Sequence, residues 1–272
     1  MIQYPHCKIN LGLSIVAKRA DGFHDLETVF YPVGLKDILE ITPAKNKETT
    51  RFSNSGLVIP GDSNNNLCLK AYHLLKADFP SLPEIQMHLH KIIPMGAGLG
   101  GGSSDGTAAL KILNTLFEIG LSQEQLISYA EKLGSDCPYF LYDTPCHATG
   151  KGTLLSPIEC NLSNYTIVIL HPGIHIATSW AFQQIVPCKK DSLISDIIRQ
   201  PIQTWKQNLV NDFESPVIKS HPIIGALKNE LYEQGAVYAS MSGSGSSLYG
   251  IFEKNKKYQK SDLTNCIRID TI

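Results

Sequence analysis

The sequence predicts an α+β fold, because two hydrophobic periods are mixed along the chain without a strict strand–helix–strand repeat. Residues 7–15 and 85–92 alternate between apolar and polar, which is the period of a strand with one buried face. A glycine-rich stretch follows the second of these segments, and after it the period becomes that of an amphipathic helix. The length of 272 residues fits two domains. We place the boundary near residue 160, which gives domains 1–160 and 161–272.

The other elements follow from turn and capping signals. Ser122 and Gln125 form a capping box that begins a helix, and Pro138 suits the first turn of another. The predicted elements, in order, are strands at 7–15, 26–31 and 85–92, a turn at 20–22, helices ending at Gly120 and Gly134, a helix start at 135–138, a strand at 165–170, a helix at 222–234, and two short strands within 236–252 around the loop Ser240–Ser247.

Composition excludes several classes of protein. The net charge is −1 and the isoelectric point is near 6.7, so we expect no nucleic-acid partner and no attachment to a membrane surface. Seven cysteines with no C-x-x-C spacing predict reduced thiols rather than disulfides or a zinc site. The first residues lack the pattern of a signal peptide, and no apolar run approaches about 20 residues. We therefore expect a cytoplasmic protein.

The strongest local signal is the glycine-rich stretch before the first helix. Five of the seven residues from Gly96 to Gly102 are glycine, which is costly in entropy unless the backbone must approach a ligand closely. A helix N-terminus after such a loop presents N–H groups and a positive dipole to a phosphate. The hydroxyl groups of Ser103 and Ser104 can add hydrogen bonds or bind Mg²⁺. The predicted nucleotide-phosphate loop is Pro94, Met95, Gly96, Ala97, Gly98, Leu99, Gly100, Gly101, Gly102, Ser103 and Ser104.

Three familiar kinds of glycine-rich segment fit this stretch less well. Gly96, Gly98 and Gly101 fit a dinucleotide-binding G-x-G-x-x-G, but two helical patterns follow instead of a second strand and its acidic residue. A Walker loop needs a lysine after its last glycine, where Gly102 stands here. A flexible linker does not account for five glycines before a capped helix. A further class of nucleotide-binding loop remains.

Three motifs resemble those of the galactokinase, homoserine kinase, mevalonate kinase and phosphomevalonate kinase (GHMP) superfamily. They are Lys8-Ile9-Asn10-Leu11, the loop Pro94–Ser104, and Val237–Gly250 with its Ser240–Ser247 glycine motif, and they span nearly the whole chain. The resemblance implies a two-domain kinase fold with an N-terminal domain like the second domain of ribosomal protein S5 and a ferredoxin-like C-terminal domain. It also implies ATP as phosphoryl donor, with Mg²⁺ as the partner of ATP.

Further segments resemble one branch of that superfamily, which acts on a cytidine diphosphate-linked methylerythritol in the non-mevalonate isoprenoid pathway. They are Arg19–His24, Ser135–Phe140, Ala148–Gly152 and His171–Gly173. The resemblance implies that the cytosine ring stacks on Phe23 while His24 bonds its edge. Phe182 is a candidate for the other side of the ring, although its spacing with Ile185 and Val186 equally fits a helix packed on the core.

Phosphoryl transfer to an alcohol needs a base and a stabilising positive charge. Asp136 is the candidate base, because a carboxylate can take the proton of the attacking hydroxyl. Lys8 is the candidate for charge stabilisation, and Asn10, on the same strand face, for orienting the substrate. Taken alone, Asp136 is more simply a helix cap and Lys8 a solvated strand lysine. Within the matched motifs, we assign both a catalytic role.

Two further nucleotide contacts are assigned by resemblance, Asn66 on the adenine side and Lys91 at the end of the strand that enters the loop. His88 and His90 share a strand face but lack a third ligand nearby in sequence, so we predict no protein metal site. The alternatives are another GHMP kinase, of the mevalonate or homoserine type, a non-catalytic relative that senses a ligand, and, more distantly, a nicotinamide oxidoreductase. We expect a small-molecule substrate and a monomer or homodimer.

Overall fold

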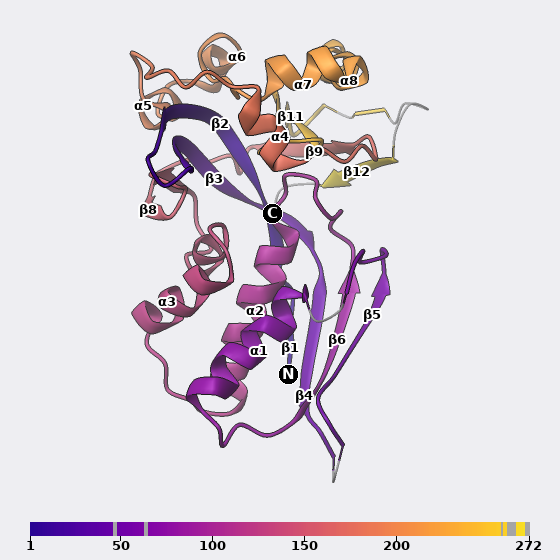
Figure 1. The fold of residues 1–272 in the computed structure, drawn as a ribbon. Helices are drawn as coiled ribbons and strands as arrows, with labels where there is room; N and C mark the ends of the chain where they lie inside the picture. The colour runs from indigo at the N-terminus through magenta and orange to yellow at the C-terminus, as the bar shows by residue number, and fades with distance from the viewer. Residues whose placement is uncertain (46–47, 63–64, 257, 260–264, 270–272) are drawn as a thin grey trace. The chain divides into compact units, whose positions relative to one another are not determined.

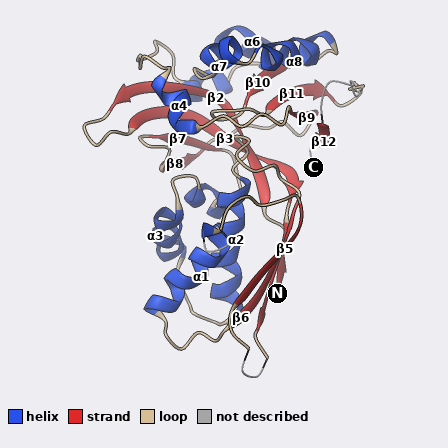
Figure 2. Ribbon diagram, turned by 45° about the vertical axis from the view of Figure 1, so that its right-hand side comes forward, coloured by secondary structure: helices blue, strands red, loops and turns tan. Residues whose placement is uncertain are grey.

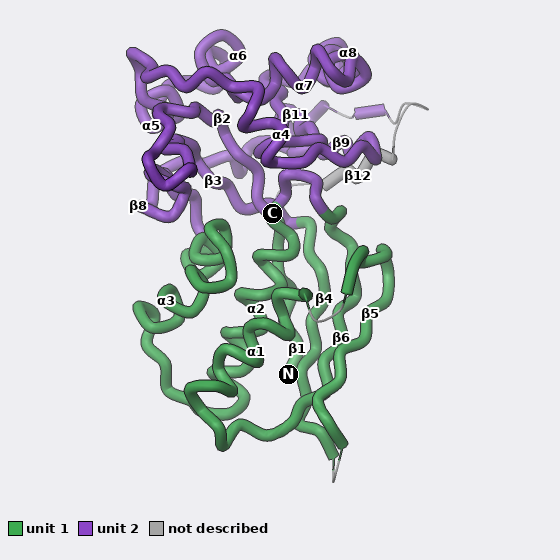
Figure 3. Tube along the Cα trace, viewed as in Figure 1, with its two compact units in different colours: residues 1–7, 35–95, 100–143 green, residues 8–34, 96–99, 144–272 purple. Residues whose placement is uncertain are grey.

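The computed structural model describes residues 1–45, 48–62, 65–256, 258–259 and 265–269. The chain forms two compact units that are each discontinuous in sequence (Figure 3). Unit 1 contains residues 1–7, 35–95 and 100–143, and unit 2 contains residues 8–34, 96–99 and 144–272. The predicted division into sequence domains at residue 160 stays a prediction, and its last residues, 270–272, lie outside the described part of the chain.

Unit 1 has a four-stranded sheet with helices on one face, as Figure 1 shows. Its elements are β1 (Ile2–Gln3), β4 (Ile38–Pro43), β5 (Arg51–Gly56), β6 (Ile85–Lys91), α1 (Leu67–Asp78), α2 (Gly101–Leu116), α3 (Gln123–Leu133) and the 3₁₀-helix η2 (Cys137–Leu141). The strand order is β1-β4-β6-β5. β6 alternates between buried and half-buried residues, which confirms the predicted one-sided strand, and its buried Met87 and Leu89 pack in one core with residues of α1 and α2.

Helix boundaries in unit 1 follow the capping chemistry of the sequence. The capping box of Ser122 and Gln125 is present at the start of α3, with both reciprocal hydrogen bonds. α2 begins at Gly101, so the last four residues of the predicted loop already form its first turn. Pro138 lies in the first turn of η2, as predicted, although that element is a 3₁₀-helix.

Unit 2 has two sheets and several short helices (Figure 2). The strands, in sheet order, are β2 (His6–Lys18), β3 (His24–Lys36), β7 (Cys146–Thr149) and β8 (Leu154–Pro157), then β10 (Tyr238–Met241), β11 (Leu248–Glu253), β9 (Tyr165–His171) and β12 (Asn265–Ile269). The helices are α4 (Thr178–Gln183), α5 (Ile194–Ile198), η3 (Ile202–Thr204), α6 (Trp205–Asn208), α7 (Glu214–Ser220) and α8 (Pro222–Glu233). Apolar side chains of α7 and α8 pack with those of β9 and β11 in one core. No helix in the described ranges is long and apolar enough to cross a membrane.

The prediction that residues 7–15 form a half-buried strand is wrong in one respect. β2 covers these residues, but both of its faces are buried, including Lys8, Asn10 and Ser14. Other parts of unit 2 adjoin the polar face: a Cβ atom at Gly243 would lie 3.6 Å from Asn10 Oδ1, and Lys8 Nζ lies 4.8 Å from the ring centroid of Phe30. Alternation of polar side chains shows which residues share a face, but it does not show whether another segment covers that face.

Candidate active site

The phosphate loop ends on a helix start that only glycine permits. Gly100 precedes α2 with a left-handed φ of 70°, and a Cβ atom at Gly101 would lie 2.7 Å from Ile93 Cγ2 and 3.0 Å from Lys91 Nζ. The N-terminus of this 16-residue helix therefore lies directly against the end of β6. Its first N–H groups have no partner within the helix and can bind an anion.

Lys91 is buried beneath this helix start, in an ion-pair network within unit 1. Its ammonium group contacts the carboxylate of Asp37 and lies 2.7 Å from Asp105 Oδ2. Asp37 also accepts hydrogen bonds from the N–H groups of Ile92 and Ile93. The network therefore ties the end of β6 to Asp105, at the start of the second turn of α2. The predicted contact between Lys91 and the nucleotide stays a prediction, and the contacts of its ammonium group are with these two carboxylates.

Burial changes the ionisation of this network. It raises the pKa of the Asp105 carboxyl to about 7, despite the opposing charge of Lys91. Burial alone would lower the pKa of Lys91, but the charges of Asp105 and Asp37 outweigh that effect and raise it. Asp105 Oδ1 is buried and has no hydrogen-bond partner among the described residues. The raised pKa follows from this burial, because a neutral carboxyl costs less to bury than a carboxylate.

Asp136 is held near the predicted phosphate loop because the next residue, Cys137, contacts α2. The backbone carbonyl of Cys137 accepts a hydrogen bond from Thr107 Oγ1 at 2.9 Å. Burial raises the pKa of the Cys137 thiol to about 11, and a hydrogen bond with Ser103 opposes that rise. Both partners lie in the first two turns of α2, so unit 1 brings Asp136 and Ser103 into one neighbourhood. The Asp136 side chain makes no capping hydrogen bond to η2, so the simple capping role weighed from sequence does not account for it.

Asn66 is the N-cap residue of α1. Its Oδ1 accepts the N–H of Cys68 at 2.8 Å. The next residue, Leu67, packs against α2 so closely that a Cβ atom at Gly106 would lie 2.8 Å from Leu67 Cβ. Asn66 therefore lies at an end of α1 that is held against the first turns of α2.

Lys8 and Asn10 are joined within unit 2, as their shared strand face predicts. Lys8 Nζ donates to Asn10 Oδ1 at 2.7 Å and lies 4.8 Å from the ring centroid of Phe30. The Asn10 amide nitrogen donates to Thr28 Oγ1 at 3.0 Å. Thr28 is thus a positioning residue that the sequence did not indicate, since it occurs in an ordinary alternating strand.

The middle of the phosphate loop, Gly96–Leu99, packs in unit 2 against the second glycine motif. Ser242 Oγ donates to the Gly98 carbonyl at 2.8 Å, and a Cβ atom at Gly98 would lie 2.0 Å from the Ser242 carbonyl oxygen. Asn211 holds the second loop from the other side by donating to the carbonyls of Met241 and Gly243. Ser242 lies in a motif that the sequence singled out, whereas no local pattern marks Asn211.

The residues predicted to hold the cytosine ring lie at one end of the β2–β3 pair. Phe23 is 59 % exposed, which confirms the predicted exposed turn. The ring of Phe182 stacks on that of His24 with centroids 4.8 Å apart, and its edge meets Phe213 in the unit 2 core. Phe182 therefore packs on the core of unit 2, and its place beside the cytosine ring stays a prediction. Lys151, which was not predicted, lies 4.8 Å over the ring of Phe23.

The predicted site residues therefore form two groups, one in each unit. Unit 1 holds Asn66, Lys91, Pro94, Met95, Gly100, Gly101, Gly102, Ser103, Ser104 and Asp136. Unit 2 holds Lys8, Asn10, Phe23, His24, Gly96, Ala97, Gly98, Leu99 and Phe182. The phosphate loop belongs to both groups, since the chain passes from one unit to the other and back within it.

Comparison with known proteins defines the class of this fold and site. Residues 66–144 match the GHMP kinases N terminal domain, and residues 193–262 match the GHMP kinases C terminal domain. A crystal structure of mevalonate kinase from Methanococcus jannaschii superposes with a TM-score of 0.69 over 100 % of this chain and 98 % of that one, at 13 % identity. The α+β, two-domain fold of the GHMP kinases is confirmed.

Nearer relatives narrow the class to one family. The chain is 49 % identical to the 4-diphosphocytidyl-2-C-methyl-D-erythritol kinase of Bacteroides thetaiotaomicron over 96 % of each chain. It is 48 % identical to that of Cytophaga hutchinsonii over 98 % of this chain and 99 % of the relative. A crystal structure of 4-(cytidine 5'-diphospho)-2C-methyl-D-erythritol kinase superposes with a TM-score of 0.79 and 29 % identity, over 92 % of this chain and 90 % of that one. The chain belongs to the 4-diphosphocytidyl-2-C-methyl-D-erythritol kinase family and is an ATP-dependent kinase.

Proposed function

We propose that this kinase transfers the γ-phosphoryl group of ATP to the 2-hydroxyl of 4-diphosphocytidyl-2-C-methyl-D-erythritol, in the non-mevalonate isoprenoid pathway. The observation that carries the proposal is the identity of nearly half, over almost the full length of both chains, to kinases named for that substrate. The exposed Phe23 and the aromatic pair of His24 and Phe182 support it, since they offer flat apolar surfaces to a pyrimidine ring.

In the proposed reaction, the 2-hydroxyl oxygen forms a bond to the γ-phosphorus as the bond to the β–γ bridging oxygen breaks. Asp136 takes the hydroxyl proton, and ADP leaves with the bridging oxygen. Lys8 stabilises the negative charge on the transferred group, and Asn10 holds Lys8 in position through their hydrogen bond. The N–H groups of the phosphate loop and of the first turn of α2 bind the remaining phosphate oxygens.

We further propose that Asn66 lies on the adenine side and that Lys91 supports the loop from below. Mg²⁺ arrives with ATP and supplies charge neutralisation at its phosphates. Within the described ranges, no three His, Cys, Asp or Glu side chains are gathered to hold a metal. This donor set fits an ion held mainly by phosphates, with the hydroxyls of Ser103 and Ser104 as the protein ligands.

The test is ADP release from MgATP by the purified protein. The acceptors offered are 4-diphosphocytidyl-2-C-methyl-D-erythritol, mevalonate, homoserine and galactose. We expect turnover only with the cytidine compound, and a loss of about 10²–10⁴-fold in kcat for Asp136→Asn. Asp191→Asn, an exposed aspartate in unit 2, is the matched control and is expected to turn over normally.

Different outcomes would separate substrate from chemistry. Turnover with a different alcohol would keep the kinase but contradict the roles of Phe23 and His24. Full activity in Asp136→Asn would remove that residue as the base. Binding of the cytidine compound without any ADP release would favour a ligand-sensing relative.

A further inference from the structure

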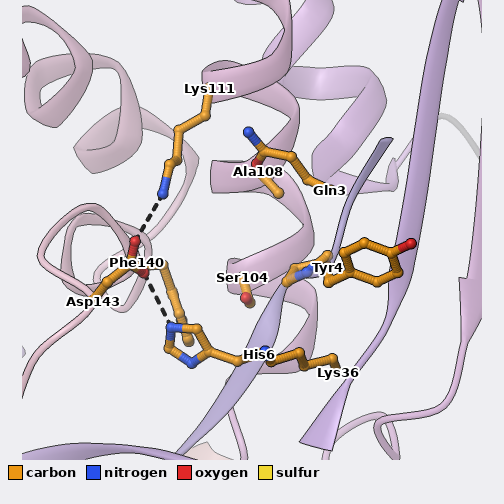
Figure 4. A pocket seen from close by; sticks show the side chains of 10 residues that line it. Gln3, Tyr4, His6, Lys36, Ser104, Ala108, Lys111, Phe140 and Asp143 are labelled. Carbon is orange, nitrogen blue, oxygen red and sulfur yellow. Dashed lines mark hydrogen bonds and ion pairs between the residues drawn. The ribbon is translucent and has the colours of Figure 1, made fainter. Parts of the chain in front are cut away.

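A small polar pocket lies in unit 1 beside α2, and its lining residues are drawn in Figure 4. Its volume is about 130 Å³, which leaves room for several water molecules or one small anion. Ser104 is the one lining residue from the predicted phosphate loop. The others include Ala108 and Lys111, one and two turns further along α2, and the segment Gln3–His6, none of which lies in a motif assigned to the nucleotide or the acceptor.

His6 lies in the wall of this pocket between two hydrogen-bond acceptors. Its Nδ1 lies 2.8 Å from the carbonyl oxygen of Cys7, and its Nε2 lies 3.1 Å from Asp143 Oδ1. The ring also lies 5.5 Å from that of Phe140, centroid to centroid, which limits its rotation. Each ring nitrogen therefore has an acceptor to which it can donate.

Asp143 is held between His6 and Lys111. Its second carboxylate oxygen lies 2.9 Å from Lys111 Nζ, and Figure 4 shows both contacts. The hydrogen bond from His6, followed by that from Lys111, lowers the pKa of Asp143 to about 2. The backbone of Asp143 has a φ of 52°, in the left-handed region, which aspartate tolerates better than most residues. Asp143 is thus a fixed carboxylate that orients the side chains of His6 and Lys111.

The pocket wall nevertheless keeps an excess of positive charge. Lys36 also lines it, and within the described part of the chain no carboxylate pairs with Lys36. Two lysines, Lys36 and Lys111, line the pocket together with one carboxylate, which gives a net charge of +1. The His6 ring and the Gln3 amide add further donors. Lysine ammonium groups and hydroxyls are common ligands of phosphate oxygens.

We propose that this pocket binds a phosphate group other than those of ATP, with Lys36 and Lys111 as its charged ligands and the His6 ring as a further donor. The group is either a free phosphate ion or the phosphate of a small monoester, whose organic part extends through the open side of the pocket.

Calorimetric titration at low ionic strength tests the proposal, with the nucleotide site first saturated with ADP. Inorganic phosphate and glycerol 3-phosphate are titrated in separate arms. We expect saturable binding in at least one arm, and the tighter arm identifies the source of the phosphate. Lys36→Met should weaken that binding at least tenfold, and Lys111→Met should weaken it as well. Lys70→Met removes the same charge from an exposed position of α1 in the same unit and should leave the affinity unchanged.

A spectroscopic measurement keeps the test independent of how well the variants fold. The ring nitrogens of ¹⁵N-labelled histidines are followed during the same titration, and His6→Gln identifies the His6 signals. We expect the His6 signals to shift with the same dissociation constant as the calorimetry. The proposal is overturned if ADP abolishes phosphate binding, if Lys36→Met binds phosphate as tightly as Lys70→Met, or if the His6 signals do not move.

Discussion

Lys91 in unit 1 and Lys8 in unit 2 are buried to the same degree but have different neighbours. Their exposed fractions are 1 % and 4 %. Lys91 lies between the carboxylates of Asp37 and Asp105. Lys8 donates to the neutral amide of Asn10 and lies over the ring of Phe30. The contacts of Lys91 join segments of unit 1 that are 54 and 14 residues away from it, whereas the contacts of Lys8 with Asn10 and Phe30 lie within the β2–β3 pair.

These contacts distinguish Lys91, which supports the fold, from Lys8, for which we propose a catalytic role. The Lys91 network joins the end of β6 to Asp105 at the start of the second turn of α2, so it stabilises the helix start that follows the predicted phosphate loop. The contacts of Lys8 with Asn10 and Phe30 fix its position. A preorganised charge of this kind is what stabilises a phosphoryl group in transfer.

Lys91→Met should have the largest effect on stability, because it leaves Asp37 and Asp105 buried without their cation. Breaking a buried ion pair by removing one partner costs about 3–5 kcal/mol. Urea unfolding measures this change against Lys70→Met, the exposed control in the same unit. A loss below about 1 kcal/mol would contradict the structural role of Lys91.

Lys8→Met should have its main effect on turnover. Removing one preorganised donor typically lowers kcat by about 10²–10³-fold, or about 2.7–4 kcal/mol. Its loss of unfolding free energy should be smaller than that of Lys91→Met, because Lys91→Met leaves two buried acidic side chains without their cation. The measurement is kcat for ADP release together with urea unfolding of the same variant. If Lys8→Met lost stability but kept its turnover, Lys8 would have a structural role and its proposed catalytic role would be contradicted.

Local secondary structure around the candidate site could be predicted from the sequence, whereas contacts between distant segments could not. The capping box at Ser122, the alternation of 85–92 and the exposed turn at Phe23 are local patterns, and the structure confirms each of them. The burial of the polar face of β2 involves Phe30 and Gly243, which are far from it in sequence. Local periodicity does not contain that information.

The same limit applies to the partners of the two lysines. Lys91 meets Asp37 and Asp105, which lie 54 and 14 residues away and belong to no shared motif. Resemblance therefore assigned Lys91 to the nucleotide without indicating that two carboxylates surround it. Lys8 and Asn10 are two residues apart on one strand, so their contact followed from the strand period.

Asp105→Asn should have the smallest effect and should depend on pH. The folded-state pKa of Asp105 is raised to about 7 from 3.8, chiefly by burial. Between these values the folded protein binds a proton that the unfolded chain releases, so this contribution to stability is complete below about pH 4 and is lost as the pH rises through 7. From pH 5 to pH 8 the wild-type free energy of unfolding should fall by roughly 2 kcal/mol on this account.

Asparagine resembles the protonated acid at every pH, so the variant Asp105→Asn should lack this decrease. Urea unfolding at both pH values measures the difference between the two proteins, in which the other titrating groups cancel. If the variant lost stability with pH as steeply as the wild type, Asp105 would be ionised in the folded protein, and the Lys91 network would hold two carboxylates against one cation.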